Sequence, residues 1–332
     1  MIGLLCLLFG LAAVVGVPDD APRVRLFEFT YRAAIEKMPA GTGKVEVWVP
    51  YPQSNQQQEI LDVEVKAPEG LAIFQEPKYG NLIVHLTLEN PRSSPIEIEM
   101  RFKVLRREYV RKDFDRAVND PAERPDPGVA RFLLPSARVP LNDQVREWAE
   151  EVTVGKKTDL EKARAIYDYA LANLKYDKTG QGWGNGDLLY VCDQKRGNCT
   201  DFHALFNGFA RAVGIPARFS IGFPLPEERG GGEIVGYHCW SEFYLDGYGW
   251  VPIDASEAWK NPSKRDYFFG AHDENRIYFS TGRDLVLRPR QEGAPLNYFI
   301  YPYAELDGKP FGQISYHFSF KDLPLDEVAS VR

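Results

Sequence analysis

The sequence lacks the features that mark several classes of protein. It has no basic run with interleaved aromatic residues, and its 47 Asp and Glu outnumber its 40 Lys and Arg, for a formal net charge of −7. We therefore do not expect nucleic acid as a partner. Its glycine-dense stretch, residues 179–187, does not follow a strand pattern and contains no Gly-Lys-Ser/Thr, which excludes a phosphate-binding loop. The sequence also contains no internal repeat and no low-complexity segment.

Charge is absent from the N-terminus as well. Residues 1–17 contain no charged side chain, and the apolar stretch 2–15 is followed by Gly16, Val17 and Pro18. This pattern predicts a signal peptide that is cleaved after Gly16 or Val17, and hence an exported protein, periplasmic or extracellular. The stretch is shorter than the roughly 20 apolar residues of a membrane-spanning helix. Retention as a membrane anchor is the alternative, so we expect contact with a membrane only if this segment stays uncleaved.

Cysteine is scarce. Of the four cysteines, Cys6 falls within the predicted signal, which leaves Cys192, Cys199 and Cys239. An odd number of cysteines in a compartment that permits disulfides predicts at least one free thiol.

The remaining sequence predicts an α+β fold. With 332 residues, 44% of them hydrophobic, the chain is long enough for two or three packed units. Residues 22–110 alternate apolar and polar side chains between Pro, Gly and Asn turns, which predicts an N-terminal antiparallel β-sandwich. The proline-rich residues 111–140 are predicted to form a linker. Residues 141–322 begin with helical spacing and end in alternating strand patterns, which predicts a second domain with a β-rich C-terminal extension.

A helix in this second domain places a thiol at its N-terminus. Asn198 is a favourable N-cap, so Cys199 is predicted to be the first helical residue. Unpaired backbone N–H groups and the positive end of the helix dipole favour an anion there, which lowers the pKa of the thiol. The same backbone N–H can face a developing oxyanion. Cys199 is therefore the candidate nucleophile.

An imidazole and a carboxylate follow in the order that a thiolate acyl-transfer enzyme needs. On the predicted strand 236–245, His238 and Cys239 point to opposite sides, so only one of them is expected to face the helix. If that residue is His238, a hairpin lays Asp254, at the end of the next strand, near the imidazole. Cys199, His238 and Asp254 would then be nucleophile, general base and orienting acid.

Alternatives to this assignment stay open. His203 lies one helical turn from Cys199 and competes with His238 as the base, although it is further from the terminus where a substrate would approach. A zinc site is a second alternative, but the cysteines and histidines lack the Cys-x2–4-Cys or His-x3–5-His spacing of structural zinc, so we expect no metal. Each residue taken singly also has a structural explanation, such as a buried thiol or a turn-forming carboxylate. Cys239, turned from the site, is placed by hypothesis in a disulfide with Cys192.

Four blocks between residues 140 and 260 resemble the transglutaminase-like superfamily. They are the nucleophile helix, its exit, the histidine strand and the aspartate strand, at residues 196–206, 210–218, 238–244 and 249–254. The resemblance implies a papain-like, cysteine-protease-like core that needs no metal or organic cofactor. Bacterial members with an export signal and an N-terminal β-domain are similar to this chain.

The resemblance also implies roles for further residues. Cys199 would carry a thioester intermediate, and a side chain that precedes it in sequence would help to hold the oxyanion. Gln181, Trp183 and Tyr190 are the candidates, and Trp183 is favoured because an indole N–H only donates hydrogen bonds. Trp240, two residues after the histidine, is a candidate for substrate binding.

These observations predict an exported cysteine enzyme that forms an acyl-enzyme at Cys199 from the amide of a peptide or protein. Water would resolve it in a peptidase or amidase, and an amine would resolve it in a crosslinking enzyme. Hydrolysis is the favoured outcome, because transfer additionally requires an amine site and exclusion of water. The alternative is a catalytically silent module of the same fold that binds peptides or cell-surface groups.

Overall fold

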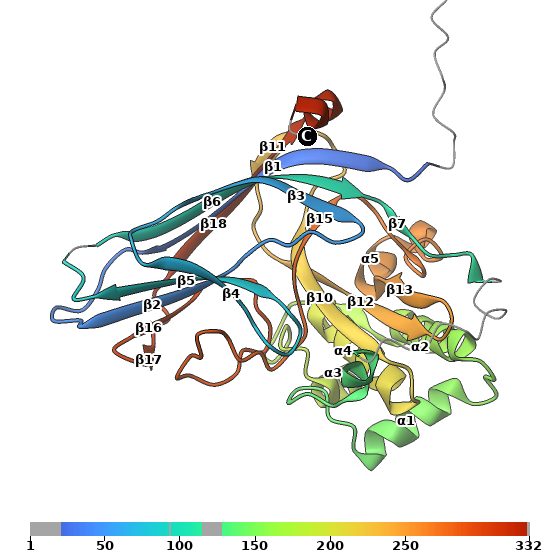
Figure 1. The fold of residues 1–332 in the computed structure, drawn as a ribbon. Helices are drawn as coiled ribbons and strands as arrows, with labels where there is room; N and C mark the ends of the chain where they lie inside the picture. Colours follow the sequence, from blue (N-terminus) through green and yellow to red (C-terminus); the bar gives the residue numbers. More distant parts are fainter. Residues whose placement is uncertain (1–20, 93, 115–127, 331–332) are drawn as a thin grey trace, which may run out of the picture.

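Two antiparallel sheets pack face to face in the computed structural model, which describes residues 21–92, 94–114 and 128–330 (Figure 1). One sheet has the strand order β11 (Gly231–Glu233), β18 (Ser315–Leu323), β1 (Val24–Ile35), β6 (Ile96–Arg107) and β3 (Gln58–Lys66). The other has the order β17 (Lys309–Pro310), β16 (Tyr303–Leu306), β2 (Lys44–Pro50), β5 (Leu82–Glu89) and β4 (Leu71–Gln75). The predicted signal at residues 1–17 and the middle of the predicted linker lie outside the described residues.

Alternation along the strands builds the core of this sandwich. In β1, Phe27, Phe29 and Tyr31 are fully buried, and they face Phe102 and Val104 of β6 in the same cluster. Side chains with period two all point to one face of a strand, so the alternating sequence is enough to place them inside. The predicted α+β fold with an N-terminal antiparallel sandwich is confirmed.

The boundary of the sandwich differs from the expectation of residues 22–110. Strand β18 pairs with β1 over nine residues, from Leu26 opposite Leu323 to Ala34 opposite Ser315. Strand β16 pairs with β2 in the second sheet. The last strands of the chain, assigned from sequence to the domain 141–322, thus complete both sheets of the sandwich, because β1 and β2 would otherwise leave open edges.

A four-stranded antiparallel sheet and a group of helices form the other half of the molecule (Figure 1). The sheet order is β13 (Gly249–Ile253), β12 (His238–Leu245), β10 (Ala217–Pro224) and β15 (Arg276–Thr281). The helices are α1 (Asp143–Thr153), α2 (Asp159–Asn173), α3 (Leu188–Gln194), α4 (Cys199–Ala212) and α5 (Ala255–Lys260). One short strand pair, β7 (Tyr109–Val110) with β14 (Ala271–His272), joins the halves. A second short pair, β8 (Lys175–Tyr176) with β9 (Arg196–Gly197), lies within the helical half.

Helix α4 lies where two hydrophobic clusters meet. Phe202 and Phe206 belong to the cluster under the helices, whereas Cys199 belongs to the cluster that fills the sandwich. Ile221 and Cys239 of the four-stranded sheet belong to that second cluster too. The first residue of α4 therefore sits at the junction of the two halves.

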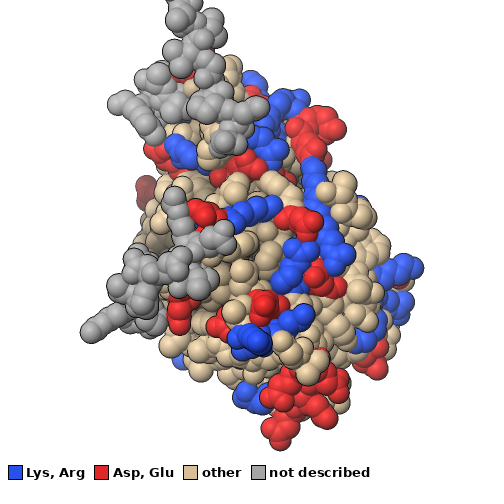
Figure 2. All heavy atoms as spheres, turned by 90° about the vertical axis from the view of Figure 1, so that its right-hand side faces the viewer, with Lys and Arg blue, Asp and Glu red and all other residues tan. Residues whose placement is uncertain are grey.

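The surface over the helices carries both signs of charge, and basic and acidic side chains interleave on it (Figure 2). Arg164 pairs with Asp168 and Asp266, and Asp168 also pairs with Arg265. In the described part of the chain, no helix has the length and apolar composition needed to cross a membrane.

Candidate active site

The N-terminus of α4 is built as its sequence predicts. Cys199 is the first helical residue, and the Asn198 side chain accepts a hydrogen bond of 2.9 Å from the backbone N–H of Thr200. In return the Asp201 carboxylate accepts one of 2.9 Å from the backbone N–H of Asn198, so the two residues form a capping box. At the first position of a helix, the N–H of Cys199 has no partner within the helix. That N–H is therefore available to a substrate oxyanion that forms next to the Cys199 sulfur.

The glycine-dense loop folds over this terminus. Asp201 is fully buried, and it also accepts hydrogen bonds from the backbone N–H groups of Gly184 at 2.6 Å and Gly186 at 3.0 Å. Gly184 has a φ of +81°, and a Cβ on it would lie 3.3 Å from the Asn198 amide, so the loop approaches the cap closely. The loop thereby brings half-buried Trp183 to the neighbourhood of the nucleophile.

The other two oxyanion candidates lie beside the same loop. Gln181 is exposed within it, and Tyr190, on α3, packs its ring against the backbone of Gly182. The Tyr190 hydroxyl is buried and has no hydrogen-bond partner among the described residues. The loop that carries Gln181 and Trp183, with Tyr190 against it, therefore lies over the start of α4, and the choice among the three stays a prediction.

The β12–β13 hairpin brings His238 and Asp254 together. The strands pair from Leu245 opposite Gly249 to Ser241 opposite Ile253, which puts Asp254 just past the end of β13 and close to the start of β12. His238 Nε2 donates a hydrogen bond of 2.6 Å to Asp254 Oδ2. His238 also interacts with the Cys199 side chain, and each group favours the charged form of the other. Because Nε2 is engaged by Asp254, the ring nitrogen left for the sulfur is Nδ1.

Asp254 is held by both of its oxygens. As the N-cap of α5, its Oδ1 accepts hydrogen bonds of 3.0 Å from the backbone N–H of Glu257 and from the Ser256 hydroxyl. Oδ2 accepts from His238 and, at 2.9 Å, from the buried Arg276. The cap fixes the carboxylate, and the cation keeps it ionised. Sequence reasoning did not find Arg276, because 22 residues separate it from Asp254 and no local pattern links them.

The electrostatics of the site favour a thiolate beside an imidazolium. Burial works against charge on both groups, but the hydrogen bonds to Cys199 from Cys239 and His238, with the charge of His238, hold the pKa of Cys199 well below its usual value. Burial would lower the pKa of His238, yet Asp254 and Cys199 raise it to about 10. Asp254 keeps a pKa well below its usual value despite burial, because His238 and Arg276 stabilise the carboxylate. All three shifts therefore favour the ion pair in the absence of substrate.

Cys239 lies at the site, contrary to the expectation that strand parity turns it away. Its sulfur is 3.7 Å from Thr200 Oγ1 and 3.6 Å from His203 Nδ1, both on α4. Parity does put Cys239 on the face toward the helix; His238, the first residue of β12, nonetheless reaches Cys199 because it lies at the strand end, opposite Gly222, which has no side chain. Alternation along β12 predicts that only one of His238 and Cys239 approaches the helix. This fails here because His238 is the first residue of the strand.

The hypothesised disulfide between Cys192 and Cys239 is also wrong. Cys192, Cys199 and Cys239 are all free thiols. Cys192 packs in the cluster under the helices, whereas Cys239 packs in the cluster of the sandwich. Burial raises the pKa of Cys192 to about 11, which leaves it an inert thiol.

The alternative base, His203, sits behind the site. It is fully buried, its Nε2 lies 3.7 Å from Asp254 Oδ1, and burial lowers its pKa to about 4. His203 is therefore a neutral ring that packs between Cys239 and Asp254. Among the described residues, no three His, Cys, Asp or Glu side chains are grouped so as to hold a metal ion.

Tyrosines surround the sulfur, and no sequence pattern had singled them out. Tyr237 lies 2.7 Å from Thr200 Oγ1 through its hydroxyl and accepts a hydrogen bond of 3.1 Å from Asn198 Nδ2. Its ring packs against Tyr298 and Tyr301, at centroid distances of 5.4 and 6.0 Å. These rings come from parts of the chain far apart in sequence. They leave Cys199 only 3% exposed.

Trp240 lies on the other face of β12 from Cys239. Its ring centroid is 6.1 Å from that of His238 and 5.8 Å from that of His272, and the Arg276 guanidinium lies 5.1 Å from it. The side chain is buried, with 3% exposed, and lines a separate cavity. Through these contacts Trp240 supports His238 and Arg276, and its role in substrate binding stays a prediction.

Comparisons with known proteins bear on the fold and on the core domain. The chain is 28% identical over 353 residues to an uncharacterized protein of Haemophilus influenzae, covering 96% of this chain and 94% of that one. It is 27% identical over 138 residues to the uncharacterized protein YebA of Bacillus subtilis, covering 37% of this chain and 19% of YebA. The crystal structure of a candidate cysteine protease from Cytophaga hutchinsonii shares the fold, with a TM-score of 0.62, 18% identity and 92% of each chain covered. Residues 146–255 match the model of the transglutaminase-like superfamily core, so this part of the chain contains a transglutaminase-like core domain.

Proposed function

We propose that the protein is a cysteine enzyme that forms an acyl-enzyme at Cys199 from the amide of a peptide or protein. The observation that carries the proposal is the position of His238, which is hydrogen-bonded to Asp254 through Nε2 at 2.6 Å and interacts with the Cys199 side chain. A nucleophile, a base and a group that orients the base are the parts that covalent acyl transfer requires. All three residues lie within the segment that matches a transglutaminase-like core, which supports the same chemistry.

The proposed reaction starts from a Cys199 thiolate and a protonated His238. The Cys199 thiolate attacks the amide carbonyl carbon, and the carbonyl oxygen takes up the negative charge of the tetrahedral intermediate. The backbone N–H of Cys199 stabilises that oxygen, together with a donor from the loop over the helix, for which we propose Trp183 before Gln181 and Tyr190. His238 passes its proton to the departing amine as the C–N bond breaks, which leaves a thioester and a neutral imidazole.

The second half of the reaction releases the acyl group. His238 now takes a proton from water as the water oxygen attacks the thioester carbonyl, and the C–S bond breaks to give a carboxylic acid and the Cys199 thiolate. An amine in place of water would give a new amide and a crosslink. We propose hydrolysis as the main outcome, because transfer needs a second site that binds the amine and excludes water.

Alkylation of the thiol tests the state of the site without a known substrate. We expect iodoacetamide at pH 6 to modify the wild-type protein once, at Cys199, because an ordinary thiol is mostly protonated at that pH. Cys199→Ala should remove the label, and the matched variant Cys192→Ala should keep it, since Cys192 is buried with a raised pKa. Intact-mass measurement and peptide mapping give the result. An absence of labelling in the folded wild-type protein contradicts the proposal and favours the silent binding module.

Product analysis distinguishes hydrolysis from transfer. The protein is incubated with unfolded proteins and glutamine-containing peptides, with and without a labelled primary amine. New peptide termini or released ammonia without incorporation of the amine indicate a peptidase or amidase. Incorporation of the amine indicates transfer, and neither product should form with Cys199→Ala.

We also propose that residues 1–17 direct the protein out of the cytoplasm. Fractionation of cells that express the full chain should place it in the periplasm or medium, with an N-terminus at Val17 or Pro18 by mass. A version without residues 1–17 should stay in the cytoplasm. Recovery of the full chain with the membranes would indicate an uncleaved anchor.

A further inference from the structure

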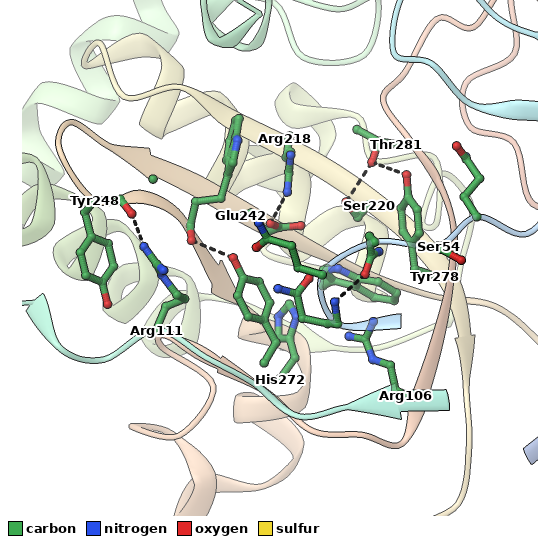
Figure 3. Close-up of a pocket in the computed structure, with 18 residues that line it drawn as sticks. Ser54, Arg106, Arg111, Arg218, Ser220, Glu242, Tyr248, His272, Tyr278 and Thr281 are labelled. Atoms are coloured by element: carbon green, nitrogen blue, oxygen red, sulfur yellow. Dashed lines mark hydrogen bonds and ion pairs between the residues drawn. The ribbon is translucent and has the colours of Figure 1, made fainter. Parts of the chain in front are cut away.

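A second cavity lies on the face of the four-stranded sheet that turns away from α4 (Figure 3). It has a volume of about 530 Å³, within the range of pockets that hold small molecules. Arg106 enters it from β6, Arg111 from the segment after β7, and Arg218 and Glu242 from the sheet. Residues 53–57, which carry three glutamines, a serine and an asparagine, close one side.

Arg106 is the least compensated charge in this cavity. Its side chain is buried, with 3% of the residue exposed, and its Nε has no hydrogen-bond partner among the described residues. Burial and the charge of Arg276 lower the pKa of Arg106 to about 10, while Asp273 and Glu242 act on it only through charge. A guanidinium without a paired anion is costly to bury, and an anionic ligand in the cavity would offset that cost.

Two more guanidinium groups add to the positive charge. Arg218 pairs with Glu242 at 2.5 Å and lies 4.1 Å from the ring centroid of Trp250. Arg111 donates to the backbone carbonyl of Tyr248 and lies 4.2 Å from the centre of its ring. The Nε atoms of Arg111 and Arg218 are buried without a hydrogen-bond partner among the described residues. Three cations thus face one carboxylate in a partly enclosed space, which concentrates a positive potential there.

We propose that this cavity binds a small organic anion that carries hydroxyl groups, with its carboxylate or phosphate paired to Arg106. Planar guanidinium groups match the oxygens of both acid groups. The amide and hydroxyl side chains of residues 53–57, with the Thr281 and Ser220 hydroxyls, supply donors and acceptors for the remaining polar atoms of the ligand. Aromatic faces complete the wall and suit an apolar ring face.

The cavity is separate from the acyl site. Cys239 and the start of α4 lie on one face of β12, and Trp240 and Glu242, which line the cavity, lie on the other. Trp240 forms the partition, because its ring also contacts His238 and the Arg276 guanidinium that bonds Asp254. A ligand there would sit behind the proposed triad. The inference therefore stands or falls independently of the acyl-transfer proposal.

Calorimetry and thermal unfolding with defined probes test the proposal. The probes are glucuronate, glucose 6-phosphate, inorganic phosphate and, as an uncharged match, glucose. We expect the wild-type protein to bind at least one anion saturably and to melt at a higher temperature in its presence, with no such shift from glucose. Preference for glucuronate would assign a carboxylate ligand, and preference for the phosphates a phosphate ligand.

Variants of neighbouring arginines supply the control. Arg106→Gln should weaken the binding of the anion at least tenfold, while Arg107→Gln, at the next residue of β6 and outside the cavity, should bind as the wild type does. Arg106→Gln removes an unpaired buried charge, so we expect it to melt no lower than the wild type without ligand. Should it fail to fold, Arg111→Gln is the second variant, with binding weakened in the same way. The proposal is overturned if no anion binds at millimolar concentration, if glucose binds as well as the anions, or if the folded variant binds them as the wild type does.

Discussion

Two cysteines with opposite pKa shifts lie side by side at the candidate active site. The pKa of Cys199 is held well below its usual value, whereas burial and the negative charge of Cys199 raise the pKa of Cys239 well above it. Cys239 therefore stays a protonated thiol that donates to the Cys199 thiolate. A hydrogen bond to a charged group contributes roughly 1.5–3 kcal/mol, so this neighbour has a measurable share in the charge of the nucleophile.

Removal of that donor should raise the pKa of Cys199. In Cys239→Ala we expect the pH midpoint of alkylation at Cys199 to move upward by about one to two units, since 1.36 kcal/mol corresponds to one pKa unit. Cys239→Ser keeps a donor and should move the midpoint less. Initial rates of iodoacetamide modification against pH give the midpoint, with Cys192→Ala as the control. An unchanged profile in Cys239→Ala would show that Cys239 only fills space.

Substitution of Cys199 and substitution of Asp254 should lower the rate of acyl transfer to different extents. Cys199→Ala should abolish acyl transfer, because the sulfur forms the bond. Asp254→Asn should retain a residue of activity, about 10⁴-fold below the wild type, because the carboxylate orients and charges His238 without bonding the substrate. Rates on a substrate found by product analysis test this. Equal and small losses in both variants would place the chemistry elsewhere.

Asp254→Asn should also lower the stability of the folded protein. The carboxylate pKa of Asp254 is depressed in the folded state, so its stabilising contribution is present above the usual carboxyl pKa and is lost as pH falls through the folded value. At neutral pH, Asp254→Asn leaves the buried Arg276 without its closest anion, and the loss of one partner of a buried pair costs roughly 3–5 kcal/mol. Urea unfolding at pH 7 measures this loss, with the exposed Asp159→Asn as the control.

At the scale of elements, the site depends on the contact between a loop and the end of a helix. Asp201 ties the glycine-dense loop to α4 through the N–H groups of Gly184 and Gly186, while it closes the capping box with Asn198. One carboxylate therefore fixes the direction of the nucleophile helix and the position of the oxyanion candidates. The loop has few other anchors, among them the Asn185 carbonyl, which accepts from Arg283 and Asn297.

Asp201→Asn should loosen the loop before it unfolds the protein. The two carboxylate oxygens of Asp201 accept hydrogen bonds from three backbone N–H groups, and an asparagine has only one oxygen that can accept. The substitution therefore leaves a buried backbone N–H unpaired at a cost of about 1–3 kcal/mol. We expect faster hydrogen exchange across residues 180–187, a lower Tm and slower alkylation of Cys199. Mass-spectrometric exchange measures the loop directly, and exchange in α2 serves as the internal control. Unchanged exchange at 180–187 would mean that other contacts hold the loop.

At the scale of the whole molecule, the two ends of the chain close one structure. Arg25 of β1 pairs with Asp322 of β18, 297 residues away, at 2.7 Å. The hydrophobic cluster of the sandwich includes Cys199 and Cys239 as well as Phe29. The sandwich and the half that holds the candidate active site thus share a core, and their unfolding should be one event.

Removal of the last strands should therefore disable the whole protein. A chain that ends at Ile300 lacks β16, β17 and β18 and exposes the edges of β1 and β2, so we expect aggregation or loss of a cooperative melt. A chain that ends at Pro324 keeps every strand and should melt close to the full protein. Circular dichroism and tryptophan fluorescence follow both, and in the full chain they should give coincident transitions. Two separate transitions in the full chain would instead indicate two domains that unfold independently.

The sequence by itself determined the features that depend on neighbours along the chain. The cap at Asn198, the position of Cys199 in the helix, the alternation of β1 and the β12–β13 hairpin all follow from spacings of a few residues. The order of thiol, imidazole and carboxylate can also be read from the sequence, and the resemblance of its motifs indicated the transglutaminase-like core that the family model matches. Local geometry fixes these elements because each is set by backbone hydrogen bonds and side-chain direction within a turn or a strand.

Only the tertiary structure decided what meets across the chain. It brought the C-terminal strands onto β1 and β2, Arg276 onto Asp254, and the unpaired Arg106 into a cavity behind Trp240. It also placed Cys239 against α4 beside Cys199, on the helix-facing side of β12 that the sequence analysis had given to His238. Such contacts join residues tens to hundreds of positions apart, and no periodicity of 2 or 3.6 residues carries information about them.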